Sequence, residues 1–317
     1  MRKTKNTATI IGRIYDHKLV AKTVQKQGAN FGKPFIRGSI DIVTDDEGLN
    51  VVTVSYTYES PTYSSGKKNR TYDVLKSILD GQAKTVVGAG FENATIIKCD
   101  TAVEINDFYV ENSMTKEPEL VSAKRLGGGF ITVIGKDKVP PAINKRNIFD
   151  CDMLINGTTL VEPEDDGEEF LKIKGAVFSF SGALIPVEFI CKDKNGIKYF
   201  ESLDASSENP TFTEVWGNIN SQTIVEKKEE ESAFGETLVT ERTKNVREWI
   251  VVGAKPDTYE IGEDITAEEV KAKSAEREAH LAEVKANYEE YQKSRDDEPL
   301  PFGDAGSAPA AAGGFSF

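Results

Sequence analysis

The sequence predicts a mainly β fold with one long helix near its C-terminus. Apolar and polar residues alternate along many short segments, which is the pattern of strands that bury one face. Helical spacing occurs in a short segment near residue 75 and in a long one near residue 280. We therefore predict a β-barrel domain over 1–112, a second β-rich domain over 120–255, a helix over 264–295 and a disordered acidic tail over 296–317.

Three alternating segments open the first domain, at residues 8–15, 35–43 and 51–58. A short helix is predicted over 72–79, and more strand-like sequence follows up to residue 110. The side chains expected in the core of this domain are Ile10, Ile14, Ile36, Ile40, Ile42, Val52, Val54, Tyr56 and Tyr58. Three strands, one helix and at least two further strands is the order expected of an OB-fold, a five-stranded Greek-key barrel that binds oligonucleotides.

The second domain is predicted from six strand-like segments, the first at 130–135. Three glycines, Gly127–Gly129, precede it, and we interpret them as a linker or tight turn. Asn195-Gly196 is predicted to turn a hairpin between 189–192 and 197–200. The segments fit either a barrel or a sandwich, and a second OB-like unit is one of these alternatives.

Charge is distributed unevenly along the chain, which matters more than the net value of −13. Residues 1–100 carry 15 Lys and Arg against 10 Asp and Glu, and residues 101–150 carry seven of each. Residues 151–317 carry 17 Lys and Arg against 35 Asp and Glu. A basic front and an acidic rear indicate separate roles for the two ends.

The basic front holds the strongest signal for a binding surface. Proteins bind single strands of nucleic acid with a positive groove for phosphates and aromatic rings on which bases stack. Two predicted strands carry aromatic and basic residues on the face opposite their isoleucines, and two neighbouring loops are basic. The predicted nucleic-acid-binding residues are Arg13, Tyr15, Lys18, Lys22, Lys26, Lys33, Phe35, Arg37, Tyr63, Lys67, Lys68 and Arg70. Any one of them also fits an ordinary half-exposed sheet face, but the set favours single-strand binding and leaves DNA and RNA open.

Signatures of catalysis and of bound cofactors are mostly missing. Nothing in the sequence pairs the two histidines, His17 and His280, and it contains neither a P-loop nor a dinucleotide-binding glycine motif. The acidic run 162–169 does not match the spacing of an EF-hand and is expected to be a solvated turn. We therefore expect a non-enzymatic protein without cofactor or metal, and an acid-dependent nuclease is the alternative.

Other features of the sequence indicate the compartment. The first residues lack the apolar core of a signal peptide, and no apolar run approaches the ~18 residues that a membrane span needs. Three widely spaced cysteines without a CxxC pair, Cys99, Cys151 and Cys191, fit reduced thiols better than a disulfide framework or a zinc site. We expect a cytoplasmic protein that does not associate with membranes.

The end of the chain carries the most specific motif. Thr266 and Glu269 have the spacing of a capping box, which begins the long helix. Beyond this helix, the seven residues DDEPLPF at 296–302 closely resemble the acidic tip of bacterial single-stranded-DNA-binding proteins. The opening segment TATIIGRI at 7–14 is similar to the first OB strand of that family. Because fifteen residues follow Phe302 and the chain is longer than the usual one-barrel member, the resemblance is to a larger, bacteriophage-type protein.

The resemblance implies a function and a set of partners. In that family the tip docks its Phe in a pocket of replication and repair proteins, where basic residues hold the acids. By analogy, this protein would bind and protect single-stranded DNA during phage DNA replication and recombination in a bacterial host cell. The residues implied in partner binding are Asp296, Asp297, Glu298, Leu300, Pro301 and Phe302. A structural or virion-associated interaction protein with no nucleic-acid role is the alternative, and self-association and a nucleic-acid role for the second domain stay open.

Overall fold

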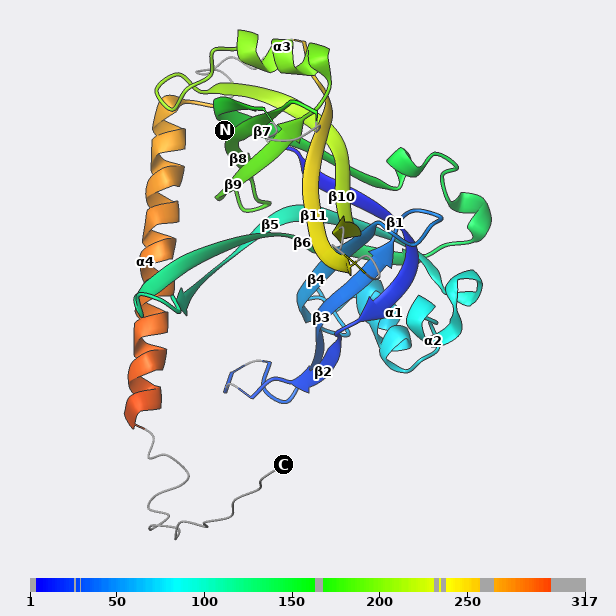
Figure 1. Cartoon of the computed structure of the whole chain (residues 1–317). Coiled ribbons are helices and arrows are strands. Elements are labelled where there is room, and N and C mark those ends of the chain that lie inside the picture. The colour runs from blue at the N-terminus through cyan, green and yellow to red at the C-terminus, as the bar shows by residue number, and fades with distance from the viewer. Residues whose placement is uncertain are drawn as a thin grey trace, which may run out of the picture. The chain divides into compact units, whose positions relative to one another are not determined.

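Strands dominate the computed structural model, which describes residues 4–25, 27–28, 30–162, 168–230, 234, 238–256 and 265–297 (Figure 1). In chain order its elements are β1 (Asn6–His17), β2 (Val20–Thr23), β3 (Pro34–Val43), β4 (Val51–Glu59), α1 (Arg70–Leu79), α2 (Val86–Ala89), η1 (Phe91–Asn93), β5 (Ile96–Glu111), β6 (Pro118–Val133), η2 (Lys136–Lys138), η3 (Ile143–Lys145), β7 (Asn147–Val161), β8 (Phe170–Phe178), β9 (Leu184–Cys191), α3 (Lys194–Ser202), β10 (Thr211–Glu230), β11 (Leu238–Ala254) and α4 (Ala267–Asp297). The mainly β fold is as predicted. Within the described ranges, no helix has both the length and the apolar character needed to cross a membrane.

The first five long strands close into a barrel. β1 pairs antiparallel with both β3 and β5, and β3 pairs antiparallel with β4. β4 runs parallel to β6 through the pair Val54↔Leu126, and β6 lies next to β5, which closes the ring. The helix α1 connects the third strand of this ring to the fourth. This is the connectivity of an OB-fold, so the OB-like barrel predicted from the order of the strands is present.

The later strands repeat the same connectivity. β7, β8 and β9 pair antiparallel in sequence, β9 runs parallel to β11, and β10 pairs with both β11 and β7. The helix α3 again connects the third strand to the fourth. The sequence left open a barrel, a sandwich or a second OB-like unit for this region. The structure has the OB-like unit. Antiparallel pairing of β1 with β7 joins the two barrels in one eleven-stranded sheet.

By compactness the chain divides into two units. One comprises residues up to 106 together with 123–277 and contains the cores of both barrels. The other comprises, among the described residues, 107–122 and 278–297. Within this second unit the ring centroids of Tyr109 and Tyr288 lie 6.0 Å apart.

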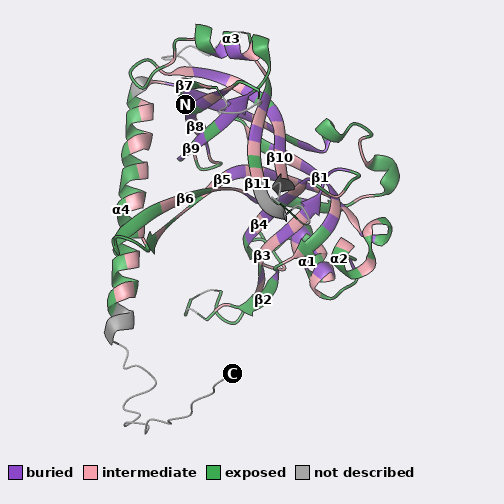
Figure 2. Ribbon diagram, viewed as in Figure 1, coloured by how far each residue is buried: buried purple, intermediate pink, exposed green. Residues whose placement is uncertain are grey.

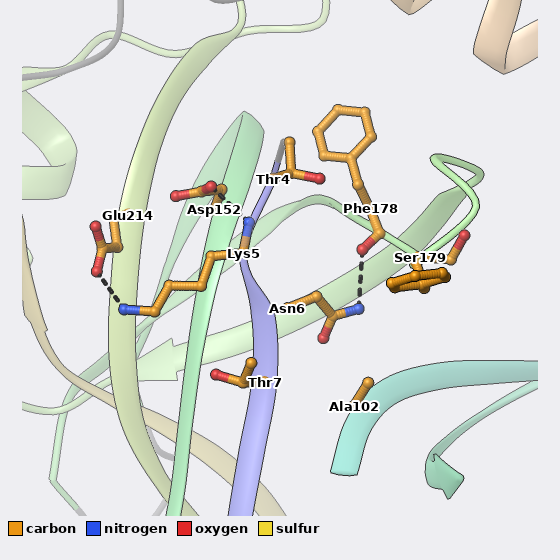
Figure 3. A pocket seen from close by; sticks show the side chains of 10 residues that line it. Thr4, Lys5, Asn6, Thr7, Ala102, Asp152, Phe178, Ser179 and Glu214 are labelled. Atoms are coloured by element: carbon orange, nitrogen blue, oxygen red, sulfur yellow. Dashed lines mark hydrogen bonds and ion pairs between the residues drawn. The ribbon is translucent and has the colours of Figure 1, made fainter. Parts of the chain in front are cut away.

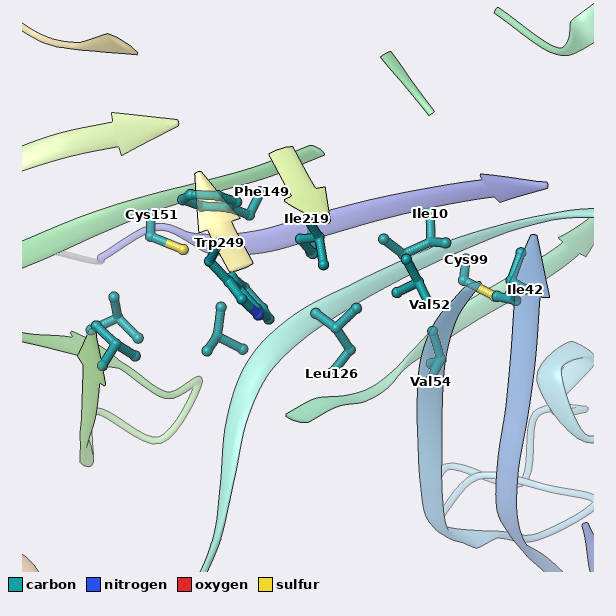
Figure 4. Packing of buried hydrophobic residues seen from close by; sticks show 14 of the residues in the cluster. Ile10, Ile42, Val52, Val54, Cys99, Leu126, Phe149, Cys151, Ile219 and Trp249 are labelled. Carbon is teal, nitrogen blue, oxygen red and sulfur yellow. The ribbon is translucent and has the colours of Figure 1, made fainter. Parts of the chain in front are cut away.

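The alternating residues of the predicted strands supply the core (Figure 2). In the first barrel the core side chains are mostly branched and aliphatic, and Ile10, Ile42 and Val54 are completely buried. The second barrel adds an aromatic cluster, in which the rings of Phe149, Phe189 and Trp249 have centroids 4.8 to 5.7 Å apart. Figure 4 shows both groups in one continuous cluster, which follows from the shared sheet.

Gly127–Gly129 is not a linker, contrary to the prediction. These residues lie inside β6, so the strand predicted at 130–135 completes the first barrel and does not open a second domain at residue 120. Gly129 has a φ of +89°, and a Cβ there would lie 1.8 Å from the carbonyl oxygen of Asp100 on β5. Glycine is required here by the close approach of two strands, which the sequence alone does not distinguish from a flexible connection.

The hairpin predicted at Asn195-Gly196 is also wrong, because these residues form the first turn of α3. The carboxylate of Asp193 accepts hydrogen bonds from the backbone N–H groups of Asn195 and Gly196, at 3.0 and 2.8 Å. Ile197 and Phe200, three positions apart, are both buried. An N-cap residue followed by an i, i+3 apolar pair indicates a helix. Here this pattern, and not the Asn-Gly turn dipeptide, predicts the structure.

Both predicted helices are confirmed. The side chain of Asn69 caps α1 by accepting from the N–H groups of Thr71 and Tyr72. The capping box of α4 is formed, since the N–H of Glu269 donates to Thr266 Oγ1 at 3.1 Å and the N–H of Thr266 donates to Glu269 Oε2 at 2.9 Å. The helix ends at Asp297, and the predicted tail beyond it lies outside the described residues.

Candidate nucleic-acid interface

The outer face of β3 and β4 carries part of the predicted binding surface. On β3, Ile36 and Ile40 are completely buried, whereas Arg37 on the opposite side is exposed and Phe35 is half-buried. This is the alternation predicted from the sequence. A β-bulge between Ile36 and Gly38 shifts the pairing of β3 with β4 at this end of the sheet.

The loop between β1 and β3 folds back along β3 through the short strand β2. Lys22 pairs with Phe35 in this antiparallel register. Gly38 allows the loop to come close, because its φ is +129° and a Cβ there would lie 2.1 Å from the carbonyl oxygen of Lys18. The loop therefore places the exposed lysines Lys18, Lys22 and Lys33 beside the outer face.

Two aromatic rings lie together on this face. The rings of Phe35 and Tyr58 are stacked, with centroids 4.8 Å apart and planes at 29°. Tyr58 is 42% exposed, so the prediction that it packs in the core is wrong, although Tyr56 is buried as predicted. The alternation that buries Val52, Val54 and Tyr56 ends where the bulge interrupts the strand pair. A tyrosine at the last position of an alternating run was the available signal, and it was not distinctive.

A hollow of about 600 Å³ opens between the two basic loops and has Tyr58 in its lining. Asn30 and Lys33 line it from one loop, and the ammonium of Lys33 donates to Asn30 Oδ1 at 3.0 Å. Tyr63, on the loop between β4 and α1, lines it from the other. This second loop is held at its base, because Asn69 Nδ2 donates to Glu59 Oε2 at 2.8 Å.

The strand and the loops that form this hollow carry further basic residues. Arg37, Lys67 and Arg70 are exposed, and Lys68 forms an ion pair with Asp73 at 2.8 Å. Residues 17–37 and 60–72 contain no Asp or Glu. The structure thus brings together Lys33, Tyr63 and Phe35 from the predicted set, with Tyr58 added. Lys26 of that set lies outside the described residues.

Of the predicted set, Lys33 and Tyr63 line this hollow. Arg13 and Tyr15 meet other parts of the molecule. The guanidinium of Arg13 lies 4.3 Å from the ring centroid of Phe91 and 3.9 Å from Glu92 Oε2, so it packs against the segment before β5. Tyr15 lines a separate hollow, whose other wall comes from β10 and β11. The alternating pattern predicted an exposed side chain at both positions. Tyr15 is exposed, but the Arg13 side chain is only 11% exposed, because it packs against Phe91.

A further hollow lies on the second barrel, beside the first residues of β1 (Figure 3). Lys5 crosses it, donating to Glu214 Oε1 at 2.8 Å and pairing with Asp150. Bonds from the ammonium groups of Lys255 and Lys5 lower the pKa of Glu214 to about 2. These charges neutralise one another, so we interpret this hollow as a structural ion cluster between β1, β7 and β10.

Metal chemistry has no support in the described residues, where no group of three or more His, Cys, Asp or Glu is placed to hold an ion. In the acidic run 162–169, residues 163–167 lie outside the described ranges. All three cysteines are free and buried, and burial raises the pKa of Cys99 and of Cys151 to about 12. Neutral buried thiols of this kind are poor nucleophiles.

Comparison with known proteins shows the family. A family model described as YorF matches residues 5–287, and the chain therefore belongs to the YorF family. No curated protein matches the sequence.

Among solved structures, the chain is similar to a deletion mutant of the single-stranded DNA binding protein from Thermus aquaticus, at 10% identity and a TM-score of 0.45, over 82% of this chain and 98% of that one. A replication protein A heterotrimer bound to ssDNA is similar at 7% identity and a TM-score of 0.21, over 81% and 67%. Both scores are low, and the function proposed below rests on the residues of this chain.

Proposed function

We propose that this YorF-family protein binds single-stranded DNA on the outer face of β3 and β4, without catalysing a reaction on it. The observation that carries the proposal is the stacked pair of half-buried Phe35 and exposed Tyr58 between two basic loops. In OB-folds the face of the second and third strands, flanked by loops, is where oligonucleotides bind. β3 and β4 hold these two positions in the first barrel.

The chemistry of this face suits a single strand better than a duplex. Rings that stack on unpaired bases contribute about 1–3 kcal/mol per base, and they are blocked when bases are paired. Exposed Lys and Arg on both sides offer contacts to phosphates, which give affinity without sequence preference. The expected ligand is therefore a single strand bound with little sequence specificity.

Gel retardation with an oligo-dT and with a duplex of matched length tests the proposal directly. We expect retention of the single strand, weak or no retention of the duplex, and intact DNA after incubation with Mg²⁺. Cleavage products would identify a nuclease instead. Absence of binding to either DNA would favour a structural or virion-associated protein.

Residues 296–302 support a second part of the proposal, which is recruitment of replication or recombination proteins in the bacterial cytoplasm during phage DNA replication. Four features of this segment suit docking on another protein: three consecutive acids, two prolines, a leucine and a terminal Phe302. A buried aromatic anchor can supply much of the binding free energy of a short segment, and the acids speed encounter with a basic pocket rim. Asp296 and Asp297 end α4, and Glu298, Leu300, Pro301 and Phe302 lie outside the described residues.

Pull-down of host or phage replication proteins tests this part separately. Truncation after Arg295 is expected to abolish partner recovery and to leave single-strand binding intact. Phe302→Ala alone is expected to reproduce most of the loss, and Phe317→Ala is the matched control. Full partner recovery with the truncated protein would exclude the tip as the docking segment.

A further inference from the structure

The hollow that contains Tyr15 is built by both barrels. Tyr15, Asp41 and Thr53 line it from β1, β3 and β4, and Gln222 and Arg247 line it from the ribbon formed by β10 and β11. Its volume is about 330 Å³, which lies within the range of small-ligand sites. The second barrel thus extends one of its hairpins to the outer face of the first.

Buried polar contacts hold the ribbon at this place. Asn50, at the start of β4, is buried, and its Nδ2 donates to the carbonyl of Ile219 at 3.2 Å. Its Oδ1 accepts from the N–H of Ser221 at 2.7 Å, and Asn50 forms a β-bridge with Gln222. The two walls of the hollow are therefore fixed relative to each other, because a side chain that satisfies two backbone groups across a junction is costly to displace.

The groups in the hollow fit one nucleotide unit. Tyr15 is 37% exposed and offers a ring face to a base. Arg247 is exposed and offers a fork of donors to a phosphate. Asp41, whose carboxylate accepts from Thr53 Oγ1 at 2.6 Å, and the amide of Gln222 offer hydrogen bonds to a base edge. A site with one cation, one acid and one ring suits a ligand that carries both a base and a phosphate better than a simple anion.

The hollow and the proposed binding face lie along the same two strands. Along β3 and β4 the register pairs Asp41 with Thr53 and Ser39 with Ser55, and the same strands then reach Phe35 and Tyr58. Six residues separate Asp41 from Phe35, which is about 20 Å of strand at ~3.3 Å per residue. A strand bound to one OB barrel covers about 4–16 nucleotides, so a path of this length is within the usual range.

We infer that single-stranded DNA bound to the first barrel continues into this hollow, where the second barrel contributes Arg247 and Gln222 to its binding. The inference rests on the proposed function and adds to it a direct role for the second barrel. It assigns the second barrel a binding role through its β10–β11 ribbon and not through its own outer sheet face.

Disulfide trapping tests the inference on the full-length protein. The three natural cysteines are buried, so Gln222→Cys introduces an accessible thiol at the hollow. An oligo-dT that carries a disulfide-tethered base is expected to cross-link to Gln222→Cys at least tenfold faster than to Lys198→Cys, an exposed position on α3. Equal rates for the two variants, with single-strand binding retained, would overturn the inference.

A length series provides an independent readout with Arg247→Ala. Affinity for a long oligo-dT is expected to fall about fivefold and the salt slope by ~0.7, because one phosphate is no longer neutralised. Affinity for an oligo too short to reach the hollow from Phe35 is expected to stay unchanged. Unchanged affinity and slope at every length would overturn the inference. If the unmodified protein binds no single strand at all, the proposed function itself fails, and that outcome is visible before any variant is compared.

Discussion

The two barrels have the same connectivity but opposite charge at the same place in the fold. In the first barrel the loop that leads to the second strand, residues 18–33, contains four lysines and no acid. In the second barrel the corresponding segment, 162–169, contains six acids and no Lys or Arg. Near their starts, both strands that follow carry an aromatic, an aliphatic and a basic residue in sequence, Phe35-Ile36-Arg37 and Phe170-Leu171-Lys172. The shared pattern reflects the shared barrel, and the charge differs in the segment before the second strand.

The outer sheet faces of the two barrels also carry different side chains. The first barrel carries a stacked ring pair, half-buried Phe35 and exposed Tyr58, and exposed lysines in its loops. On the second barrel, Lys172 on β8 forms an ion pair with Glu188 on β9 at 3.5 Å. A repeated fold therefore does not imply a repeated function, because binding depends on the side chains that a barrel presents.

The largest expected effect comes from the rings. Phe35→Ala and Tyr58→Ala should each weaken single-strand binding by about 1–3 kcal/mol, because a stacked base loses its platform. Phe170→Ala, the matched change on the second barrel, should leave binding unchanged. Fluorescence anisotropy with a labelled oligo-dT measures all three, and thermal unfolding checks that each variant is folded. An equal loss with Phe170→Ala would remove the distinction between the barrels.

The next effect concerns salt. Replacing Lys67, Lys68 and Arg70 together by Ala should flatten the dependence of log affinity on log salt by ~0.7 for each phosphate that the loop no longer neutralises. Lys172→Ala with Lys174→Ala is the control on the second barrel and should not change the slope. Titrations between low and physiological salt give the slopes. A slope that the triple variant leaves unchanged would exclude the loop between β4 and α1 from the binding surface.

A smaller effect is expected from the acidic segment of the second barrel. Converting its six acids at 162–169 to the matching amides should strengthen binding of long oligonucleotides a few-fold at low salt, because a repulsive charge is removed. The gain should vanish at physiological salt, where the screening length is about 8 Å. Anisotropy at two salt concentrations measures it. Weaker binding after this change would mean that the acids assist DNA and do not repel it.

The smallest effect concerns stability and involves the ion cluster between β1 and the second barrel. The folded-state pKa of Glu214, about 2, lies below its ordinary value of 4.5 because Lys255 and Lys5 bond to its carboxylate. Its stabilising contribution is therefore complete above about pH 4.5 and is lost as the pH falls towards 2. Glu214→Gln should lower the midpoint of thermal unfolding at pH 7, and the difference from the unmodified protein should shrink between pH 4.5 and 2. A difference that is constant with pH would contradict the ion-cluster interpretation.

The sequence predicted those features that depend on local patterns. Alternation identified the buried isoleucines of β3 and the outward direction of Arg37, and the capping residues located α1 and α4. It misassigned Gly127–Gly129 and Asn195-Gly196, because a close approach between distant strands and a helix N-cap use the same residue types as turns. These choices are decided by tertiary packing, which a local pattern does not contain.

For the site residues too, features set by a local pattern could be predicted and features set by tertiary packing could not. The outward face and the basic loops could be predicted, whereas the exposure of Tyr58 depends on a shift in the pairing of β3 with β4. Arg247 could not be connected with Tyr15 from sequence, since 232 positions separate them and only the pairing of Asn50 with the β10–β11 ribbon brings them to one hollow.

Ultraviolet cross-linking of oligo-dT to the full-length protein, followed by mapping of the modified peptides, tests the central comparison most directly. The account predicts cross-links on the peptides that contain Phe35, Tyr58 and Tyr63, and none on the peptides from β8 and β9. Cross-links concentrated on β8 and β9, with none on β3 and β4, would contradict it.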